Sequence, residues 1–438
     1  MTGERLRVVV APDSLKGSLS AAEAARAIAA GWTSVRADDE IVLRPMADGG
    51  EGTLEAFLAA HDAEVRTVRV IGADGREHDA PWTLLSDGTA VVELGVCCGI
   101  EQLGSARAPF TAHTGGFGQA IAAALDAGAR RLVLGIGSSA STDGGAGMLR
   151  ALGARLLDAD GRDVGPSLSD GGRSRPGSGS GASVSDVSGS ETSALEASVS
   201  ETPVSETPVS DLPPSASGSG SASASASASA SGSFSISGLG AVASVDLSGL
   251  RAAPDGGVLV LSDVTNPLLG PRGAAAVFGP QKGIPADRVA EVDDVLSRWS
   301  TALLAAAGRD DELLTAPGAG AAGGTGFALK IWGADLIPGA AAVAELIGLP
   351  SATAATDVVI TGEGSYDAQS AAGKVPAHVA SLSNAPAVLI AGRIAADADT
   401  SAFAAAFSLT ELAGSSEASL ADPRRWLHEA AAFAASRF

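Results

Sequence analysis

Residues 132–152 read LVLGIGSSASTDGGAGMLRAL, an apolar run that leads through a loop of Gly, Ser, Thr and Asp into small helix-forming residues. This order predicts a buried strand, a tight loop and a helix. The loop is suited to an anion, because glycines let the backbone approach it and N–H groups at a helix start point toward it. The alternative is a strand-to-helix turn with a Ser, Thr or Asp cap. The loop matches neither GxGxxG nor GxxxxGK[ST], so it is neither a standard dinucleotide fingerprint nor a Walker A loop.

Composition limits the classes of partner. The chain has 438 residues, of which 45% are hydrophobic, enough for about two or three domains with a sizeable core. Its 29 basic and 50 acidic side chains give a net charge of −21, which argues against binding to nucleic acid because phosphate backbones need clustered Lys and Arg. A few local cations can still capture a small anionic substrate in an acidic protein.

The cysteines and the N-terminal residues indicate the cellular compartment that we expect for this protein. Cys97 and Cys98 are adjacent, a spacing that favours neutral buried thiols over a disulfide or a zinc site. The first residues, MTGERLRVVVAPD, lead directly into an expected strand without an apolar leader. No run of about 18 apolar residues predicts a membrane span. We expect a cytoplasmic protein without a membrane partner, and its oligomeric state is open, a homo-oligomer being one option.

A low-complexity tract occupies residues 166–240. It consists mainly of Ser, Gly, Ala and Pro and includes SETPVSETPVS and SASASASASASGS. With almost no large apolar side chains it cannot offset its ordering entropy by burial, so it is predicted to be disordered. Its flanks predict one interrupted folded region, which makes the tract an insertion in a surface loop. The alternative is a phosphorylated or partner-binding segment.

Elsewhere the sequence alternates between short β-branched runs and helical segments. This alternation predicts an α/β fold with largely parallel sheets. The runs VRTVRVIG, HDAPWTLL and TAVVEL follow one another closely and alternate with polar residues, which predicts antiparallel pairing among them.

Five expected strands end in loops of the same chemistry, and in open α/β sheets ligands bind beyond the carboxyl ends of strands. Their polar residues are Asp13, Ser14, Lys16 and Ser18; Asp48, Gly49, Gly50 and Glu51; residues 137–145; Asp263, Thr265, Asn266 and Lys282; and Glu363, Asp367 and Lys374. Taken singly, each residue could be a turn former, a helix cap or a solvated charge. Together they suit phosphoryl transfer, which needs carboxylates for Mg²⁺, cations for phosphate charge and a carboxylate to accept a hydroxyl proton.

The motifs APDSLKGSLSA, PMADGGEGT, GIGSSASTDGGAGML, DVTNPLLGPRGAAAVFGPQKG and GEGSYDAQSAAGK occur in this order. The chain thereby resembles the bacterial glycerate kinase family of the glycerate 2-kinase type, over nearly its whole length except the Ser-rich tract. The resemblance implies a Rossmann-like parallel-sheet domain formed by residues 1–65 and 345–438. It implies a second α/β domain inserted between them, residues 66–344, with the active site in the cleft.

The resemblance also implies a reaction. ATP, with Mg²⁺, would phosphorylate D-glycerate and give a phosphoglycerate, 2-phosphoglycerate being favoured. Two alternatives remain. One is a non-catalytic protein that senses glycerate or a nucleotide, and the other is a kinase for a related hydroxy acid.

Candidate roles follow from the matched motifs, with the division between base and metal ligand left open. Catalytic candidates are Asp48, Asp143, Asp367 and Lys282. Metal candidates are Asp143, Asp367 and Glu363. Substrate-binding candidates are Ser14, Lys16, Ser18, Gly49 and Gly50. Nucleotide-binding candidates are Gly137, Ser138, Ser139, Ser141, Thr142, Gly144, Gly145 and Asn266.

The chain departs from the family pattern in the central loop. Ser138 stands where a glycine is usual, and Thr142 stands where an asparagine is usual. If the backbone at position 138 requires a positive φ, Ser138 is strained.

Overall fold

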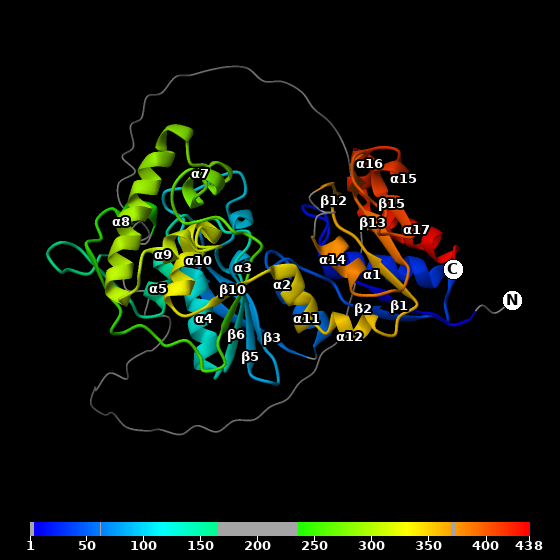
Figure 1. The fold of residues 1–438 in the computed structure, drawn as a ribbon, viewed down its shortest axis with the longest axis horizontal. Coiled ribbons are helices and arrows are strands. Elements are labelled where there is room, and N and C mark those ends of the chain that lie inside the picture. The colour runs from blue at the N-terminus through cyan, green and yellow to red at the C-terminus, as the bar shows by residue number, and fades with distance from the viewer. Residues whose placement is uncertain (1–3, 62, 165–234, 369–373) are drawn as a thin grey trace, which may run out of the picture. The chain divides into compact units, whose positions relative to one another are not determined.

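The computed structural model describes residues 4–61, 63–164, 235–368 and 374–438. In these ranges helices cover two main sheets that are mostly parallel (Figure 1). The predicted α/β class with largely parallel sheets is therefore confirmed. No helix in the described ranges is long and apolar enough to span a membrane.

The first sheet is parallel throughout, with the strand order β15-β13-β11-β1-β2. Its strands are β1 (Arg7–Val10), β2 (Glu40–Leu43), β11 (Val358–Thr361), β13 (Ala387–Ala391) and β15 (Ala405–Ser408). Since β2 lies on one side of β1 and all later strands lie on the other, the strand order reverses between β1 and β11. In such sheets this reversal opens a crevice beyond the carboxyl ends of the two strands.

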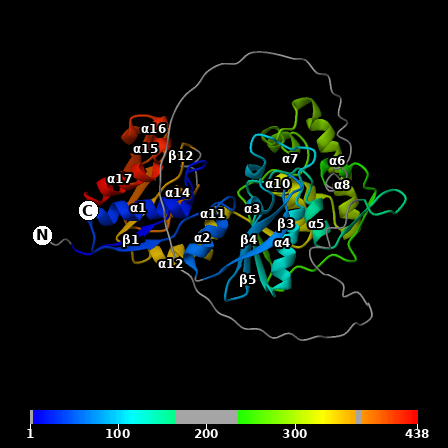
Figure 2. The same cartoon turned by 180° about the vertical axis from the view of Figure 1, so that it is seen from behind.

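Strand β1 shows how its residues determine the layers. Successive side chains of a strand point to opposite faces, and Val8 and Val10 pack in one apolar cluster with residues of α1 (Ala21–Val35) and α17 (Pro423–Ala435). Figure 2 shows these two helices from behind. Val9 packs in another cluster, with residues of α2 (Thr53–Ala60), α11 (Gly339–Leu346) and α14 (Val375–Ser381).

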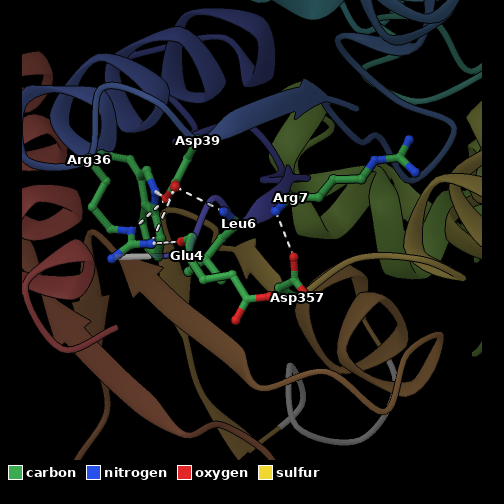
Figure 3. A network of polar contacts seen from close by, with 7 residues as sticks. Glu4, Leu6, Arg7, Arg36, Asp39 and Asp357 are labelled. Atoms are coloured by element: carbon green, nitrogen blue, oxygen red, sulfur yellow. Dashed lines mark hydrogen bonds and ion pairs between the residues drawn. The ribbon is translucent and has the colours of Figure 1, made fainter. Parts of the chain in front are cut away.

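A polar network ties the start of β1 to the turn before β2 (Figure 3). Asp39 accepts hydrogen bonds from Leu6 N at 3.0 Å, Trp32 Nε1 at 2.8 Å and Arg36 Nε at 2.6 Å. Although burial opposes ionisation, the bonds from Arg36, Leu6 and Trp32 hold the pKa of Asp39 below its ordinary value. The network thus fixes the register of the strands that lead to the crevice.

The second sheet is mixed, with the order β10-β9-β6-β5-β4-β3. Its strands are β3 (Val65–Ile71), β4 (Glu77–Leu84), β5 (Thr89–Glu93), β6 (Arg131–Gly135), β9 (Val258–Leu261) and β10 (Asp335–Ile337). The trio β3, β4 and β5 is antiparallel, as predicted, and the remaining pairs are parallel.

The remaining α-helices and strands of the described ranges are as follows. The further helices are α3 (Leu94–Cys98), α4 (Gly115–Asp126), α5 (Ala146–Ala151), α6 (Ile236–Leu239), α7 (Ala274–Phe278), α8 (Val289–Ala307), α9 (Glu312–Thr315), α10 (Ala321–Ile331), α12 (Leu349–Thr353), α15 (Leu409–Ala413) and α16 (Ser416–Ala421). The remaining strands are β7 (Arg155–Leu157), β8 (Ser244–Asp246), β12 (Ser365–Tyr366) and β14 (Arg393–Ile394).

The segments on either side of the Ser-rich tract pair with each other. Strands β7 and β8 pair antiparallel, with Leu157 opposite Ser244. Most of the predicted insertion, residues 166–240, lies outside the described residues. Its last part does not fit the prediction, because α6 buries Ile236 and Leu239 in the core. These two large apolar side chains can be buried, unlike the residues of the repeat.

The first sheet draws its strands from residues 7–43 and 358–408, and the second from residues 65–337. The domain boundaries predicted from the sequence, 1–65 with 345–438 and 66–344, remain a prediction.

Candidate active site

A cavity of about 470 Å³ lies beyond the carboxyl ends of β1 and β11, and we name it the β1–β11 cavity. The loop after β1 contributes Asp13 to it, and the loop after β11 contributes Glu363. It is lined by Asp13, Ser14, Leu15, Lys16, Ser18, Asp48, Asp263, Glu363, Gly364, Ser365, Asp367, Lys374, Val375, Gly392, Arg393, Thr410, Ser416, Ser419, Leu420 and Pro423. Loops far apart in the sequence therefore converge at the crevice, as expected for this topology.

Asp13 is the most perturbed acid of this cavity. Its side chain is buried, and its Oδ1 accepts a hydrogen bond from Ser14 N at 2.7 Å. Burial, with repulsion from Asp48 and Glu363, raises the pKa of Asp13 to about 7, against the opposing effects of Ser14 N and Lys16. A carboxyl group that titrates near neutral pH in a cavity is suited to proton transfer.

The rest of the lining combines cations with apolar surface. Lys16, Lys374 and Arg393 are exposed and border the cavity. Leu420, from α16, borders it with 64% of its surface exposed. The cavity thus offers positive charge for phosphate oxygens and an apolar wall for a ring.

A second cavity of about 380 Å³ lies at the start of the central loop, and we name it the glycine-loop cavity. It is lined by Ile100, Glu101, Arg107, Ile136, Gly137, Ser138, Ser139, Ser262, Val264, Phe278, Gln281, Lys282 and Ala322. The first half of the predicted nucleotide loop therefore reaches a cavity.

Lys282 is the buried cation of the glycine-loop cavity. Its Nζ donates hydrogen bonds to Ser141 O at 2.5 Å and to Ser139 Oγ at 3.3 Å. Burial lowers the pKa of Lys282 to about 8, although attraction to Asp143 opposes the shift. A positive charge held this way strengthens interactions with an anion, because little solvent screens it.

Ser138 has a φ of +57°. The condition for strain at this position is therefore met, because an L-residue rarely adopts such a φ. Ala322, with a φ of +51°, lines the same cavity.

The second half of the loop is buried, and Asp143 holds it through several hydrogen bonds. Its Oδ2 accepts hydrogen bonds from Thr114 N at 2.8 Å, Thr114 Oγ1 at 2.7 Å and Gly147 N at 3.2 Å, and its Oδ1 accepts one from Gly145 N at 3.2 Å. Asp143 is fully buried and lines neither cavity. With its oxygens bound in this way Asp143 is suited to cap the loop, and its role as a base or metal ligand remains a prediction.

Two glycines of the loop are explained by close approach. A Cβ on Gly144 would lie 2.5 Å from the Trp299 ring, and one on Gly145 would lie 2.4 Å from Ala328 Cβ. Both residues also have positive φ. These glycines and Thr142, which is buried, line neither cavity, so the alternative of a tight structural turn describes this half of the loop.

The two cavities adjoin at residues 48–50. Asp48 lines the β1–β11 cavity, and Gly137, which lines the other, donates its N–H to Gly49 O at 3.1 Å. A Cβ on Gly137 would lie 2.3 Å from Gly50 Cα, so only glycine permits this approach. Gly49 and Gly50 therefore connect the cavities and line neither.

The end of β9 adjoins both cavities as well. Ser262 and Val264 line the glycine-loop cavity, whereas Asp263 between them lines the β1–β11 cavity. Successive side chains of extended backbone point in opposite directions. Burial, with repulsion from Asp48, raises the pKa of Asp263, while a hydrogen bond from Gly339 N at 2.8 Å opposes the shift.

The structure thus sorts the predicted residues into three groups. The β1–β11 cavity collects Ser14, Lys16, Ser18, Asp48, Glu363 and Asp367. The glycine-loop cavity collects Gly137, Ser138, Ser139 and Lys282. Neither is lined by Gly49, Gly50, Ser141, Thr142, Asp143, Gly144, Gly145 or Asn266. Asn266 instead donates its side-chain N–H to Arg272 O at 2.8 Å.

Some cavity residues had no role assigned from the sequence. Asp13 and Asp263 were named among the strand-end residues but not among the catalytic, metal-binding or substrate-binding candidates, although each lies within three residues of the end of a strand. Arg107, Arg393 and Leu420 lie outside the quoted motifs, so nothing local in the sequence marked them.

The carboxylates of the β1–β11 cavity suit a cation that arrives with phosphates. Among the described residues, no group of three or more His, Cys, Asp or Glu side chains forms a ready metal cage. Mg²⁺ is usually bound by one or two carboxylates together with substrate phosphates, so such a cage is not needed. The lining brings five carboxylates together, and this donor set fits Mg²⁺.

Comparison with known proteins identifies the family. The profile described as the glycerate kinase family matches residues 8–174 and 222–438. A glycerate 2-kinase of Escherichia coli K12 is 35% identical over 399 residues, 90% of this chain and 86% of that protein. A glycerate kinase of Bacillus subtilis 168 is 36% identical over 404 residues, 90% of this chain and 87% of that protein.

A solved structure agrees with these relatives. The crystal structure of a protein assigned as glycerate kinase 2 from Salmonella typhimurium LT2 superposes with a TM-score of 0.71 at 33% identity. The match covers 99% of this chain and 98% of that one. The chain belongs to the glycerate kinase family and is an enzyme of the kinase class.

Proposed function

We propose that this enzyme transfers the γ-phosphoryl group of ATP to D-glycerate and releases 2-phosphoglycerate and ADP. The observation that carries the proposal is the adjacency of two cavities with complementary chemistry. One presents carboxylates and cations, and the other presents the buried ammonium of Lys282. Phosphoryl transfer depends mainly on positioning and charge stabilisation, which such an arrangement supplies.

The acids at the junction would accept the hydroxyl proton. Asp48 lies beside the connection to Gly137, and Asp13 is close enough to Asp48 for repulsion to raise its pKa. In our proposal the pair shares the role of general base, with Asp13 holding the proton near neutral pH. Lys282 offsets the negative charge of the anion bound beside it.

Two acids after β11 complete the proposed machinery. Glu363 and Asp367 are the residues that would hold Mg²⁺ together with phosphate oxygens. Bound Mg²⁺ would neutralise charge on the transferring group.

A coupled assay tests the proposal. Mg-ATP and D-glycerate should yield ADP, and phosphorus NMR of the product should show phosphate on the 2-hydroxyl. The Asp48→Asn variant should fold but lose about 10²-fold or more in turnover, the usual scale of acid–base catalysis. Thermal stabilisation by both ligands without ADP release would favour the non-catalytic sensor. Faster turnover with another hydroxy acid would favour a related kinase.

A further inference from the structure

We propose that the nucleotide binds in the β1–β11 cavity and that the hydroxy acid binds in the glycine-loop cavity. This reverses the prediction from the sequence, which placed substrate near Lys16 and nucleotide on residues 137–145. The inference rests on the proposed function and states which substrate each cavity takes.

Sheet topology is the first argument. The five-stranded sheet reverses its strand order between β1 and β11, and ligands of doubly wound sheets, nucleotides among them, bind at this point. The β1–β11 cavity lies there, and its volume of about 470 Å³ exceeds the 380 Å³ of the other.

Charge is the second argument. The β1–β11 cavity has five carboxylates, of Asp13, Asp48, Asp263, Glu363 and Asp367, and three cations, of Lys16, Lys374 and Arg393. This mixture suits a metal-bound triphosphate, because carboxylates hold the metal and cations hold the phosphate oxygens. A free hydroxy acid would meet an excess of negative charge there.

The glycine-loop cavity has the opposite balance. The cations Lys282 and Arg107 line it with a single carboxylate, that of Glu101. A small organic anion without a metal is attracted to such a site. The Ser138 and Ser139 side chains add hydroxyl groups that can bind a carboxylate.

The apolar wall is the third argument. Leu420 is 64% exposed although it borders a cavity, and Pro423 follows it in the lining. A purine ring would cover this surface, whereas glycerate has no apolar part of that size. Ligand cavities commonly combine such apolar surface with a few polar groups.

The hydrogen bonds of the central loop are the fourth argument. Several of its backbone N–H groups already donate within the protein, those of Gly137 to Gly49 O, Ala140 to Cys98 O, Gly144 to Gly323 O and Gly145 to Asp143 Oδ1. N–H groups used in this way cannot cradle a triphosphate. The hydroxy acid needs only the side chains at the start of the loop.

Calorimetry with separate ligands tests the assignment. We expect Leu420→Ser to weaken binding of Mg-ADP by about tenfold, through lost apolar contact, and to leave D-glycerate binding unchanged. We expect Arg107→Met to weaken D-glycerate by about tenfold or more and to leave Mg-ADP unchanged. The exposed residues Val35 and Arg309 supply matched controls, Val35→Ser and Arg309→Met, which should change neither.

Each outcome decides something. The opposite pattern, or unchanged affinities in both cavity variants, overturns the assignment. Wild-type protein that binds both ligands but transfers no phosphate contradicts the proposed function alone. Wild-type protein that binds neither ligand contradicts both.

Discussion

Ser138 and Ala322, 184 positions apart in the sequence, are the two non-glycine residues with positive φ in the described ranges, and both line the glycine-loop cavity. Strained backbone of this kind costs about 1–3 kcal/mol per residue and persists where surrounding structure enforces it. Its confinement to one cavity indicates that the loop geometry there serves binding more than stability.

Glycine at these positions should relieve the strain. We expect Ser138→Gly and Ala322→Gly each to raise the free energy of unfolding by about 0.5–1 kcal/mol, since relief exceeds the added entropy of the unfolded chain. Ala321→Gly, next to the strained residue but with ordinary φ, should lower it by about 0.5–1 kcal/mol. Guanidinium denaturation measures all three. If Ala321→Gly and Ala322→Gly lowered the free energy of unfolding equally, strain at position 322 would be contradicted.

Asp13 should make stability fall as pH rises. Its pKa is raised to about 7 in the folded protein, from 3.8, so between these values the folded state holds a proton that the unfolded state has released. The protonated carboxyl therefore contributes its full stabilisation below pH 3.8, and this contribution is lost as the pH rises from 3.8 to about 7. At 1.36 kcal/mol per pKa unit, the loss in the free energy of unfolding is about 4 kcal/mol. In metal-free buffer, Asp13→Asn should therefore be more stable than wild type at pH 8 and equal to it near pH 3.5.

Asp39 provides a control of opposite sign. Its pKa is lowered in the folded protein, so it stabilises the fold above the unfolded pKa and loses this effect as pH falls. Asp39→Asn should destabilise at pH 8. Thermal unfolding across pH measures both variants, and a loss of stability at pH 8 in both would rule out the burial effect claimed for Asp13.

The buried network of Asp143 predicts a structural defect. Asp143→Asn turns one accepting oxygen into a donor that faces the Thr114 or glycine N–H groups. We expect the free energy of unfolding to fall by about 1–3 kcal/mol or more. Asp126→Asn, which breaks an exposed ion pair with Arg251, should cost less than about 1 kcal/mol. A stable Asp143→Asn protein with turnover reduced about 10²-fold would instead support the predicted catalytic role of Asp143.

Removal of residues 175–221, which the family match leaves out, should be tolerated. The pairing of Leu157 with Ser244 already brings the two sides of the loop together, and loop-closure entropy changes slowly with length. We expect kcat within about twofold of wild type and a free energy of unfolding within about 1 kcal/mol. Insoluble protein, or a loss of activity beyond about tenfold, would show that the segment contributes to the fold or the site.

Local patterns predicted a large part of the fold. The β-branched runs predicted parallel strands, and the alternating trio predicted the antiparallel part of the second sheet, because both signals lie within a few residues. The gathering of Lys16, Asp48 and Glu363 was also predictable, since parallel strands bring their carboxyl ends to one edge.

Contacts between residues far apart in the sequence are the part of the site that could not be predicted. The hydrogen bonds between Asp143 and Thr114 could not be predicted, because the two residues lie 29 positions apart and no local pattern reveals such a contact. The position of Leu420 at the cavity could not be predicted for the same reason, because it depends on the packing of the C-terminal helices. Ser138 is the opposite case. Because family members usually carry glycine at this position, the sequence alone could predict a strained backbone there.

The alternation of Ser262, Asp263 and Val264 between two cavities makes the end of β9 sensitive to length. A point substitution there alters the lining of one cavity, but a single-residue insertion or deletion would exchange the side chains offered to both cavities. Libraries that seek altered acceptor preference should therefore vary residue identity at this strand end and keep its length constant. Natural relatives with a different length here would be candidates for a changed acceptor.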